Sequence, residues 1–282
     1  MSTTTTSLLT LPAPLRTFLA SFPLHTYPAI PPPRSNSLHD PAQPTMWIHA
    51  PLADPEHNLL SADVECLKWQ AHVALRGVER VRVRWDVAAA GGVGGRLPSV
   101  WVPGGEGGEL IPAHLIPAWV ERERGGEGAE GYRDEAARDE SRAWVALLEG
   151  TVHAALITFH PASTTARVSS LAATLAPPPA PLTGVSSLLP PYGARVPAAE
   201  LETRYAEAVG ALSERLGGDK WFLGSASPTP LDALAFAYIH TLLHTPAPKL
   251  RTQVTRRVNL VAWERRVSGL VRAAFVKAGE EV

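Results

Sequence analysis

The sequence predicts an α/β domain followed by an all-helical domain. In residues 45–121, short runs of strand-forming residues alternate with helical patterns, in an order that is typical of a mixed sheet covered by helices. From residue 132 onwards, apolar residues recur instead at helical spacing. A chain of 282 residues is long enough to hold two such domains.

The α/β part is expected to begin with a short strand at residues 45–50. Ser61 is expected to cap the following helix, whose apolar residues keep helical spacing until Gly77 ends it. Residues 78–85 then alternate between two faces, which predicts a half-buried strand. Its apolar face holds Val81, Val83 and Trp85, and its opposite face holds Arg80, Arg82 and Arg84.

A cluster of glycines at residues 91–95 leads to a strand at residues 97–102. Proline within a sheet is confined to strand starts, edges and bulges, so Pro98 fits a strand start. The second strand of a hairpin is expected near residues 109–111, and a helix near residues 113–121.

The helical part is organised around one capped helix that follows a turn-rich loop. Thr229, Pro230 and Asp232 predict its start as a capping box, in which the Thr229 hydroxyl accepts from the Asp232 amide and the Asp232 carboxylate accepts from the Thr229 amide. Apolar residues cover nearly all sides of the helix up to His244, which predicts that it is buried.

Further helices are expected at residues 132–159, at residues 198–216 and after Asn259, which could cap the last one. Composition changes suggest where the chain divides. We expect a proline-rich extension at 1–44, the α/β domain at 45–121, a charged and glycine-rich linker at 122–131, and the helical domain at 132–282 with a proline-rich insert near 176–197.

Composition excludes several classes of function. The net charge of −1 leaves no broad basic surface for nucleic acid, and the single cysteine, Cys66, cannot form an intrachain disulfide. We find no uncharged apolar run long enough for a membrane-spanning helix, and the N-terminus does not resemble a cleavable targeting signal. Any membrane contact is therefore expected to be peripheral.

Two runs carry a resemblance to a known family. The runs KWFLGSASPTPLDALAFAYIHTLLH and VNLVAWERRV resemble the metaxins, which are non-enzymatic members of the glutathione-transferase-like proteins. The resemblance implies a glutathione-transferase-like fold, with an N-terminal thioredoxin-like domain at 45–121 followed by a helical C-terminal domain. It also implies that Pro98 follows a cis peptide bond, as the proline before the third strand does in that fold.

Two runs nearer the N-terminus, PAPLRTFLASFPLHTYP and CLKWQAHVALRGV, are similar to the smaller metaxin-like subunit of the mitochondrial sorting and assembly machinery, the SAM complex. This resemblance implies a peripheral, non-enzymatic protein on the cytosolic face of the mitochondrial outer membrane, active in protein transport and β-barrel assembly. The implied partners are the β-barrel core subunit, a second metaxin-like subunit and the sorting signals of β-barrel precursors. No cofactor is implied.

In a thioredoxin-like sheet the second strand is an edge, so Arg80, Arg82 and Arg84 allow two interpretations. The charges could discourage unwanted strand pairing, or the edge could dock a partner segment by strand addition or by charge.

The enzymatic alternative is a glutathione-dependent transferase or peroxidase, in which Ser61 or Cys66 would stabilise the thiolate. A helix cap explains Ser61, and a buried position explains Cys66. The acid–Ser/Thr pair that such enzymes place after the fourth strand is missing from residues 110–114. A soluble adaptor of cytosolic assemblies with the same fold is a third possibility.

We expect no metal site. His240 and His244 have the i, i+4 spacing of metal ligands, but no glutamate follows His240 as in zinc proteases, and histidines are common near a helix end for their interaction with its dipole.

Overall fold

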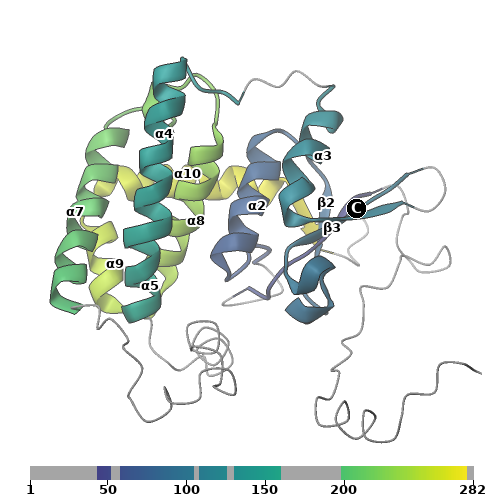
Figure 1. The fold of residues 1–282 in the computed structure, drawn as a ribbon, viewed down its shortest axis with the longest axis horizontal. Coiled ribbons are helices and arrows are strands. Elements are labelled where there is room, and N and C mark those ends of the chain that lie inside the picture. The colour runs from purple at the N-terminus through teal and green to yellow at the C-terminus, as the bar shows by residue number, and fades with distance from the viewer. Residues whose placement is uncertain (1–42, 52–57, 105–107, 126–129, 160–197, 278–282) are drawn as a thin grey trace, which may run out of the picture.

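A computed structural model describes residues 43–51, 58–104, 108–125, 130–159 and 198–277. Residues 1–42 of the expected N-terminal extension and the whole proline-rich interval at 176–197 lie outside the described residues. The described part consists of a small sheet with its helices on one side of the molecule and a set of longer helices on the other (Figure 1).

The sheet has five strands in the order β4-β3-β1-β2-β5. Strand β1 pairs in parallel with β2 and antiparallel with β3, while β3 and β4 form an antiparallel hairpin. Helix α2 (Val64–Leu75) connects β1 to β2 and packs against α3 (Ile116–Glu123). The strands are β1 (Thr45–Trp47), β2 (Val81–Arg84), β3 (Ser99–Val102), β4 (Glu109–Pro112) and β5 (Phe275–Lys277).

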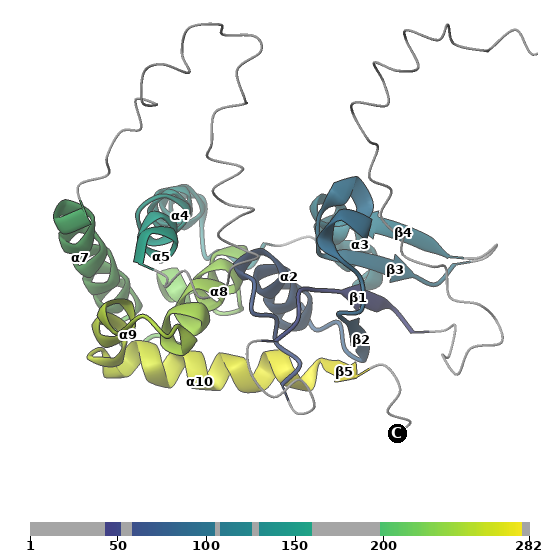
Figure 2. The same ribbon diagram turned by 90° about the horizontal axis from the view of Figure 1, so that it is seen from below.

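The prediction that the second strand is an edge is wrong. Strand β5 comes from the C-terminal part of the chain and lies in parallel beside β2, with Val81 opposite Phe275. Helix α10 (Val258–Ala273) makes this possible because it runs from the helical side of the molecule to the sheet and delivers β5 there (Figure 2). The amide of Val81 donates to the carbonyl of Ala274 at 3.1 Å, so the β2 backbone is already paired.

The three arginines therefore do not form a ladder on a free strand edge. Arg80 lies before β2 in a left-handed conformation with φ 60°. Arg82 is half-buried within the strand, and its backbone lies opposite Val276. Arg84 forms an ion pair with Asp86 and lies over the ring of Trp47, 5.7 Å from its centroid. Docking of a partner strand at β2 is excluded by β5.

The helical side is built from α4 (Glu135–Leu147), α5 (His153–Phe159), α7 (Ala198–Leu216), α8 (Pro230–His244), α9 (Pro248–Thr255) and α10. The helix expected at 132–159 is present as α4 and α5, joined by the π-helical turn Leu148–Val152. Short 3-10 turns occur at Ala89–Gly91, Val93–Gly95, Ala113–Leu115 and Phe222–Gly224. Helix α9 was not anticipated.

Asn259 does not cap the last helix, which begins at Val258 with Arg257 as its N-cap residue. Its side chain instead ties α10 to the end of α7. The Asn259 amide nitrogen donates to the carbonyls of Ser213 and Gly217 at 2.8 and 3.2 Å, and its oxygen accepts from the Ser213 hydroxyl at 2.7 Å.

Helix α8 lies at the centre of the molecule. All its residues from Leu231 to Leu242 are buried, and the helix packs against α2 of the sheet side and against α4, α9 and α10 of the helical side. An apolar surface on all sides of a helix requires such complete covering. Helix α8 thus belongs to the cores of both halves of the molecule.

The start of α8 is held by the capping box of Thr229 and Asp232. The Asp232 carboxylate accepts from the Thr229 amide at 2.8 Å and from the Thr229 hydroxyl at 2.7 Å. Its other oxygen accepts from the amide of Phe222 at 2.8 Å, which fixes the preceding loop to the helix. Burial raises the pKa of Asp232 to about 6, while these hydrogen bonds act in the opposite direction.

We expect Asp232→Ala to lower the free energy of unfolding by about 2–4 kcal/mol, because it removes the carboxylate of the capping box and leaves two buried amides without acceptors. Chemical denaturation followed by circular dichroism measures this. The control is Asp139→Ala, since Asp139 is an exposed aspartate of α4 whose ion pair with Arg142 is also exposed and should contribute less than about 1 kcal/mol. Equal effects of the two substitutions would contradict the assigned role of Asp232.

We expect Phe275→Ala to destabilise the protein by about 3–5 kcal/mol, because the Phe275 side chain is buried where β5 joins β2. The matched control is Leu270→Ala on the preceding helix. The Leu270 side chain is 48% exposed, so this substitution should change the free energy of unfolding by less than about 0.5 kcal/mol. Denaturation curves of the two variants compare these values directly, and a loss at Phe275 no larger than that at Leu270 would show that β5 does not hold the sheet.

Candidate functional site at the junction of strand β1 and helix α2

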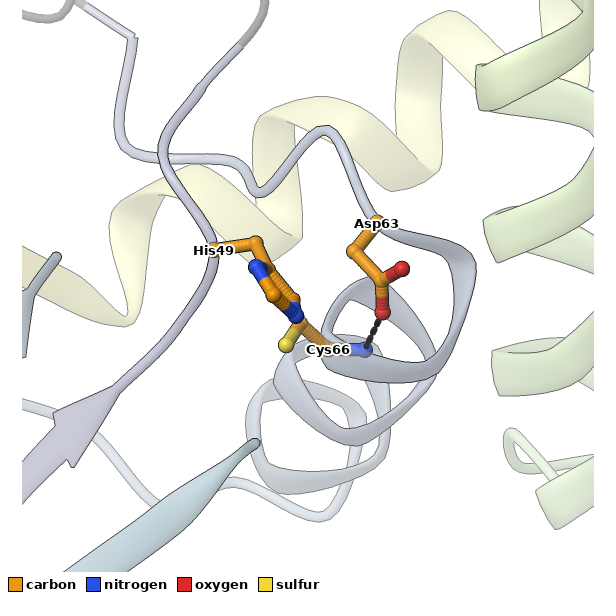
Figure 3. Close-up of side chains that lie close together, drawn as sticks. All are labelled: His49, Asp63 and Cys66. Carbon is orange, nitrogen blue, oxygen red and sulfur yellow. Dashed lines mark hydrogen bonds between the residues drawn. The ribbon is translucent and has the colours of Figure 1, made fainter. Parts of the chain in front are cut away.

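The segment between the end of β1 and the first turn of α2 is where the resemblance implies a thiolate-stabilising group. The structure brings together His49, Asp63 and Cys66 in this place (Figure 3), and Ser61 is hydrogen-bonded to the backbone of His49 and Asp63. His49 follows β1, and Cys66 lies in the first turn of α2. One potential ligand atom each from His49, Asp63 and Cys66 lies within 4.8 Å of the others.

The N-cap residue of α2 is Asp63, and the prediction that Ser61 caps this helix is wrong. The Asp63 carboxylate accepts from the amide of Cys66 at 3.1 Å. The pattern at the start of α2 contains both a serine and an aspartate, and only the backbone conformation decides which of them has the capping geometry. Ser61 lies two residues too early and takes part in a turn.

The hydroxyl of Ser61 is fully engaged in that turn. It donates to the carbonyl of His49 at 2.8 Å and accepts from the amide of Asp63 at 3.1 Å. The backbone of the same residue is held by Gln70, whose side chain accepts from the Ser61 amide at 2.9 Å and donates to the Leu59 carbonyl at 2.8 Å. Ser61 is buried, and in this structure its proton is donated to the carbonyl of His49.

Cys66 is buried completely and packs in the core. Burial raises the pKa of its thiol far above the usual range, and the nearby Asp63 carboxylate raises it further. A thiol must be deprotonated and accessible to act as a nucleophile. The cysteine therefore lies at the expected position of a catalytic group without the environment that would activate it.

The other elements of a glutathione site were also located. The Leu97–Pro98 peptide bond is cis, and Pro98 is buried directly before β3, in the position that the resemblance assigned to it. After β4 the chain forms the turn Ala113–Leu115 and enters α3, and residues 110–120 contain no acid–Ser/Thr pair that could hold a γ-glutamyl group. The cis proline that the resemblance implied is thus present, and the acid–Ser/Thr pair is missing from residues 110–120.

Some residues with potential functional chemistry were not recognised from the sequence. His49, Asp63 and Gln70 complete the network around Ser61 and Cys66, and a signal for Asp63 existed because aspartate is as good an N-cap as serine. At the far end of α8, Glu264 of α10 lies against His240. No spacing rule could have found this contact, since the two residues belong to different helices.

Comparisons with known proteins agree with this architecture. A family model described as the C-terminal domain of glutathione S-transferases matches residues 205–267. A Metaxin-1 homolog from Caenorhabditis briggsae is 42% identical over 65 residues, which are 22% of this chain and 20% of that protein. The matched segment therefore covers a fifth of that relative's length.

Solved structures extend the similarity to most of the chain. A glutathione-transferase-like protein from Pseudomonas syringae has a TM-score of 0.51 at 12% identity, covering 84% of this chain and 70% of that one. A glutathione S-transferase from Methylobacterium radiotolerans in complex with glutathione sulfonate has a TM-score of 0.50 at 14% identity. The match covers 85% of this chain and 99% of that one. At such identities these matches show the fold alone.

The comparisons show a glutathione-transferase-like fold for the chain, and a similarity to a metaxin over 65 residues. The predicted fold class, with a thioredoxin-like part followed by a helical C-terminal domain, is confirmed. The resemblance to metaxins is matched by this similarity over 65 residues. Assignment to a subunit of the SAM complex stays a prediction.

We expect Cys66 in the native protein to be unreactive towards a thiol reagent such as Ellman's reagent, because the thiol is buried and protonated. In denaturant, one thiol per chain should react, since the chain has a single cysteine. Absorbance of the released chromophore measures both reactions. Fast stoichiometric labelling of the native protein would contradict the closed site.

Proposed function

We propose that this metaxin-like chain is a non-enzymatic binding subunit of the machinery that assembles β-barrel proteins in the mitochondrial outer membrane. The observation that carries the non-enzymatic part is the closed network at the junction of β1 and α2. There the Ser61 hydroxyl is already donated to a backbone carbonyl, and the Cys66 thiol is buried and protonated. The similarity to a Metaxin-1 homolog supports the assignment to this machinery.

The proposed location is the cytosolic face of the outer membrane, with peripheral contact. Among the residues that the structure describes, no helix is long and apolar enough to cross a bilayer. The proposed partners are the β-barrel core subunit and a second metaxin-like subunit, and the chain would help to recognise the sorting signals of β-barrel precursors. With the β2 edge covered by β5, these contacts are proposed to use side-chain surfaces rather than strand addition at β2.

A glutathione-dependent transferase or peroxidase is the competing function. The observation in its favour is the fold itself, since one structural match is a glutathione S-transferase in complex with glutathione sulfonate. Against it are the missing acid–Ser/Thr pair after β4 and the absence of an available hydroxyl at Ser61. The two functions differ in whether the protein binds glutathione, which can be measured.

We expect the tagged chain, isolated from mitochondria in a mild detergent, to co-purify with a β-barrel outer-membrane protein and a second metaxin-like chain. Mass spectrometry identifies the co-purifying proteins, and mitochondria that express the tag alone serve as the control. The same protein should pass through immobilised glutathione without retention. Recovery of a single chain that is retained on glutathione and eluted by free glutathione would overturn the proposal.

A further inference from the structure

The C-terminal end of α8 carries a cluster of side chains that the proposed function does not use. His240 and His244 lie one turn apart on α8, and Glu264 reaches them from α10. We propose that His240 and His244 bind a divalent transition-metal ion such as Zn²⁺ through their Nε2 atoms, with Glu264 holding the imidazole of His240 in the ligating orientation. This proposal differs from the sequence-based expectation of no metal site, which was based on two histidines without a neighbouring glutamate in the sequence.

The three side chains are close enough to act on one ion. One potential ligand atom from each lies within 4.8 Å of the others, and the two imidazole rings have centroids 4.1 Å apart and are tilted by 35°. The Nδ1 atom of His240 is 2.6 Å from Oε1 of Glu264. Spacing of i, i+4 on a helix places both histidines on the same face, where they can approach a common position.

The hydrogen bonds show which ring nitrogen of each histidine is already bonded and which one could bind an ion. A carboxylate and a carbonyl only accept, so Nδ1 of His240 donates to Glu264, and Nδ1 of His244 donates to the carbonyl of His240 at 2.8 Å. With Nδ1 as the donor in each ring, the nitrogen that can carry a lone pair is Nε2. Histidine ligands typically donate their other ring N–H to a carboxylate or a backbone carbonyl in this manner.

Both imidazoles can also present this lone pair to an ion. His244 is exposed. The side chain of His240 is 7% exposed at the end of α8.

Local charge favours a cation on balance. The carbonyl end of α8 provides a partial negative charge, and the Glu264 carboxylate adds a full one at 2.6 Å from His240. Arg272 of α10 acts in the opposite direction, since it brings a positive charge near His240. Two imidazoles suit Zn²⁺, Ni²⁺ and Cu²⁺ and do not suit Ca²⁺ or Mg²⁺, which prefer oxygen ligands.

The other group of potential ligands, His49, Asp63 and Cys66, fits a metal less well. The Asp63 carboxylate already accepts the amide of Cys66 as the cap of α2, and the Cys66 thiol is buried and protonated. A metal there would have to enter the core and displace the cap. Metal binding at the C-terminal end of α8 requires neither entry into the core nor loss of a helix cap.

An ion at this position would strengthen the link between the two halves of the molecule. Glu264 lies in the helix that carries β5 to the sheet, and the histidines lie on the helix that packs against α2. A ligand that binds the folded state alone raises its stability in proportion to the logarithm of the ligand concentration over the dissociation constant. Binding should therefore raise the melting temperature of the protein, in addition to giving a heat of binding in calorimetry.

The test is titration of the untagged full-length chain with ZnCl₂, followed by isothermal calorimetry and by the melting temperature. The key variant is His244→Gln, because His244 is exposed and its replacement should not disturb folding. Its matched control is His114→Gln, which alters an exposed histidine in the turn before α3. Glu264→Gln keeps an acceptor for His240 but removes the charge.

We expect wild type and His114→Gln to bind Zn²⁺ equally and to melt at a higher temperature with it. In His244→Gln this binding should weaken by at least about 100-fold, and in Glu264→Gln by about 10–100-fold, the usual effect of changing the hydrogen-bond partner of a ligating histidine. No saturable binding by wild type, or unchanged binding by His244→Gln, would overturn the proposal. Either result leaves the proposed binding function untouched, because that function does not require a metal.

Discussion

The buried carboxylate of Asp232 is the interaction on which most of the structure depends. It closes the capping box at the start of α8 and fixes the Phe222 amide, and the Phe222 ring then packs edge-on against Trp263 of α10 at 5.2 Å between centroids. One side chain thus sets the position of a loop, a central helix and the helix behind it. Because α8 has no solvent-exposed face over Leu231–Leu242, a shift at its start would be transmitted to every helix that packs on it.

Helix α10 adds a second connection between the halves. It packs on α2, α7, α8 and α9 and then continues into β5, which pairs with β2. The thioredoxin-like sheet is therefore completed by β5, which is distant from the other four strands in the sequence. A sheet of this kind cannot be separated from the helical part without losing a strand and the buried side chain of Phe275. The two halves should accordingly unfold together rather than as independent domains.

The sequence was sufficient to predict elements whose signals are local. The capping box of α8, the helix at 198–216 and the hairpin around residues 99–112 depend on neighbouring residues, and all are present in the structure. Contacts between distant segments were missed: β5 beside β2, Asn259 against α7, and Glu264 against His240. Three residues such as Phe275–Lys277 have too little pattern to indicate a strand, and become one only because α10 places them beside β2.

The site at the junction of β1 and α2 shows why residue type and position do not by themselves establish a catalytic function. Ser61 and Cys66 are chemically suitable and lie where this fold can hold a thiolate. Their hydrogen bonds and burial decide otherwise, since the serine proton is donated to the His49 carbonyl and the thiol is sealed in the core. In this chain the same residues stabilise the turn that starts α2. The Ser61 hydroxyl and the Cys66 amide are thus part of the hydrogen bonds that fix the backbone between β1 and α2.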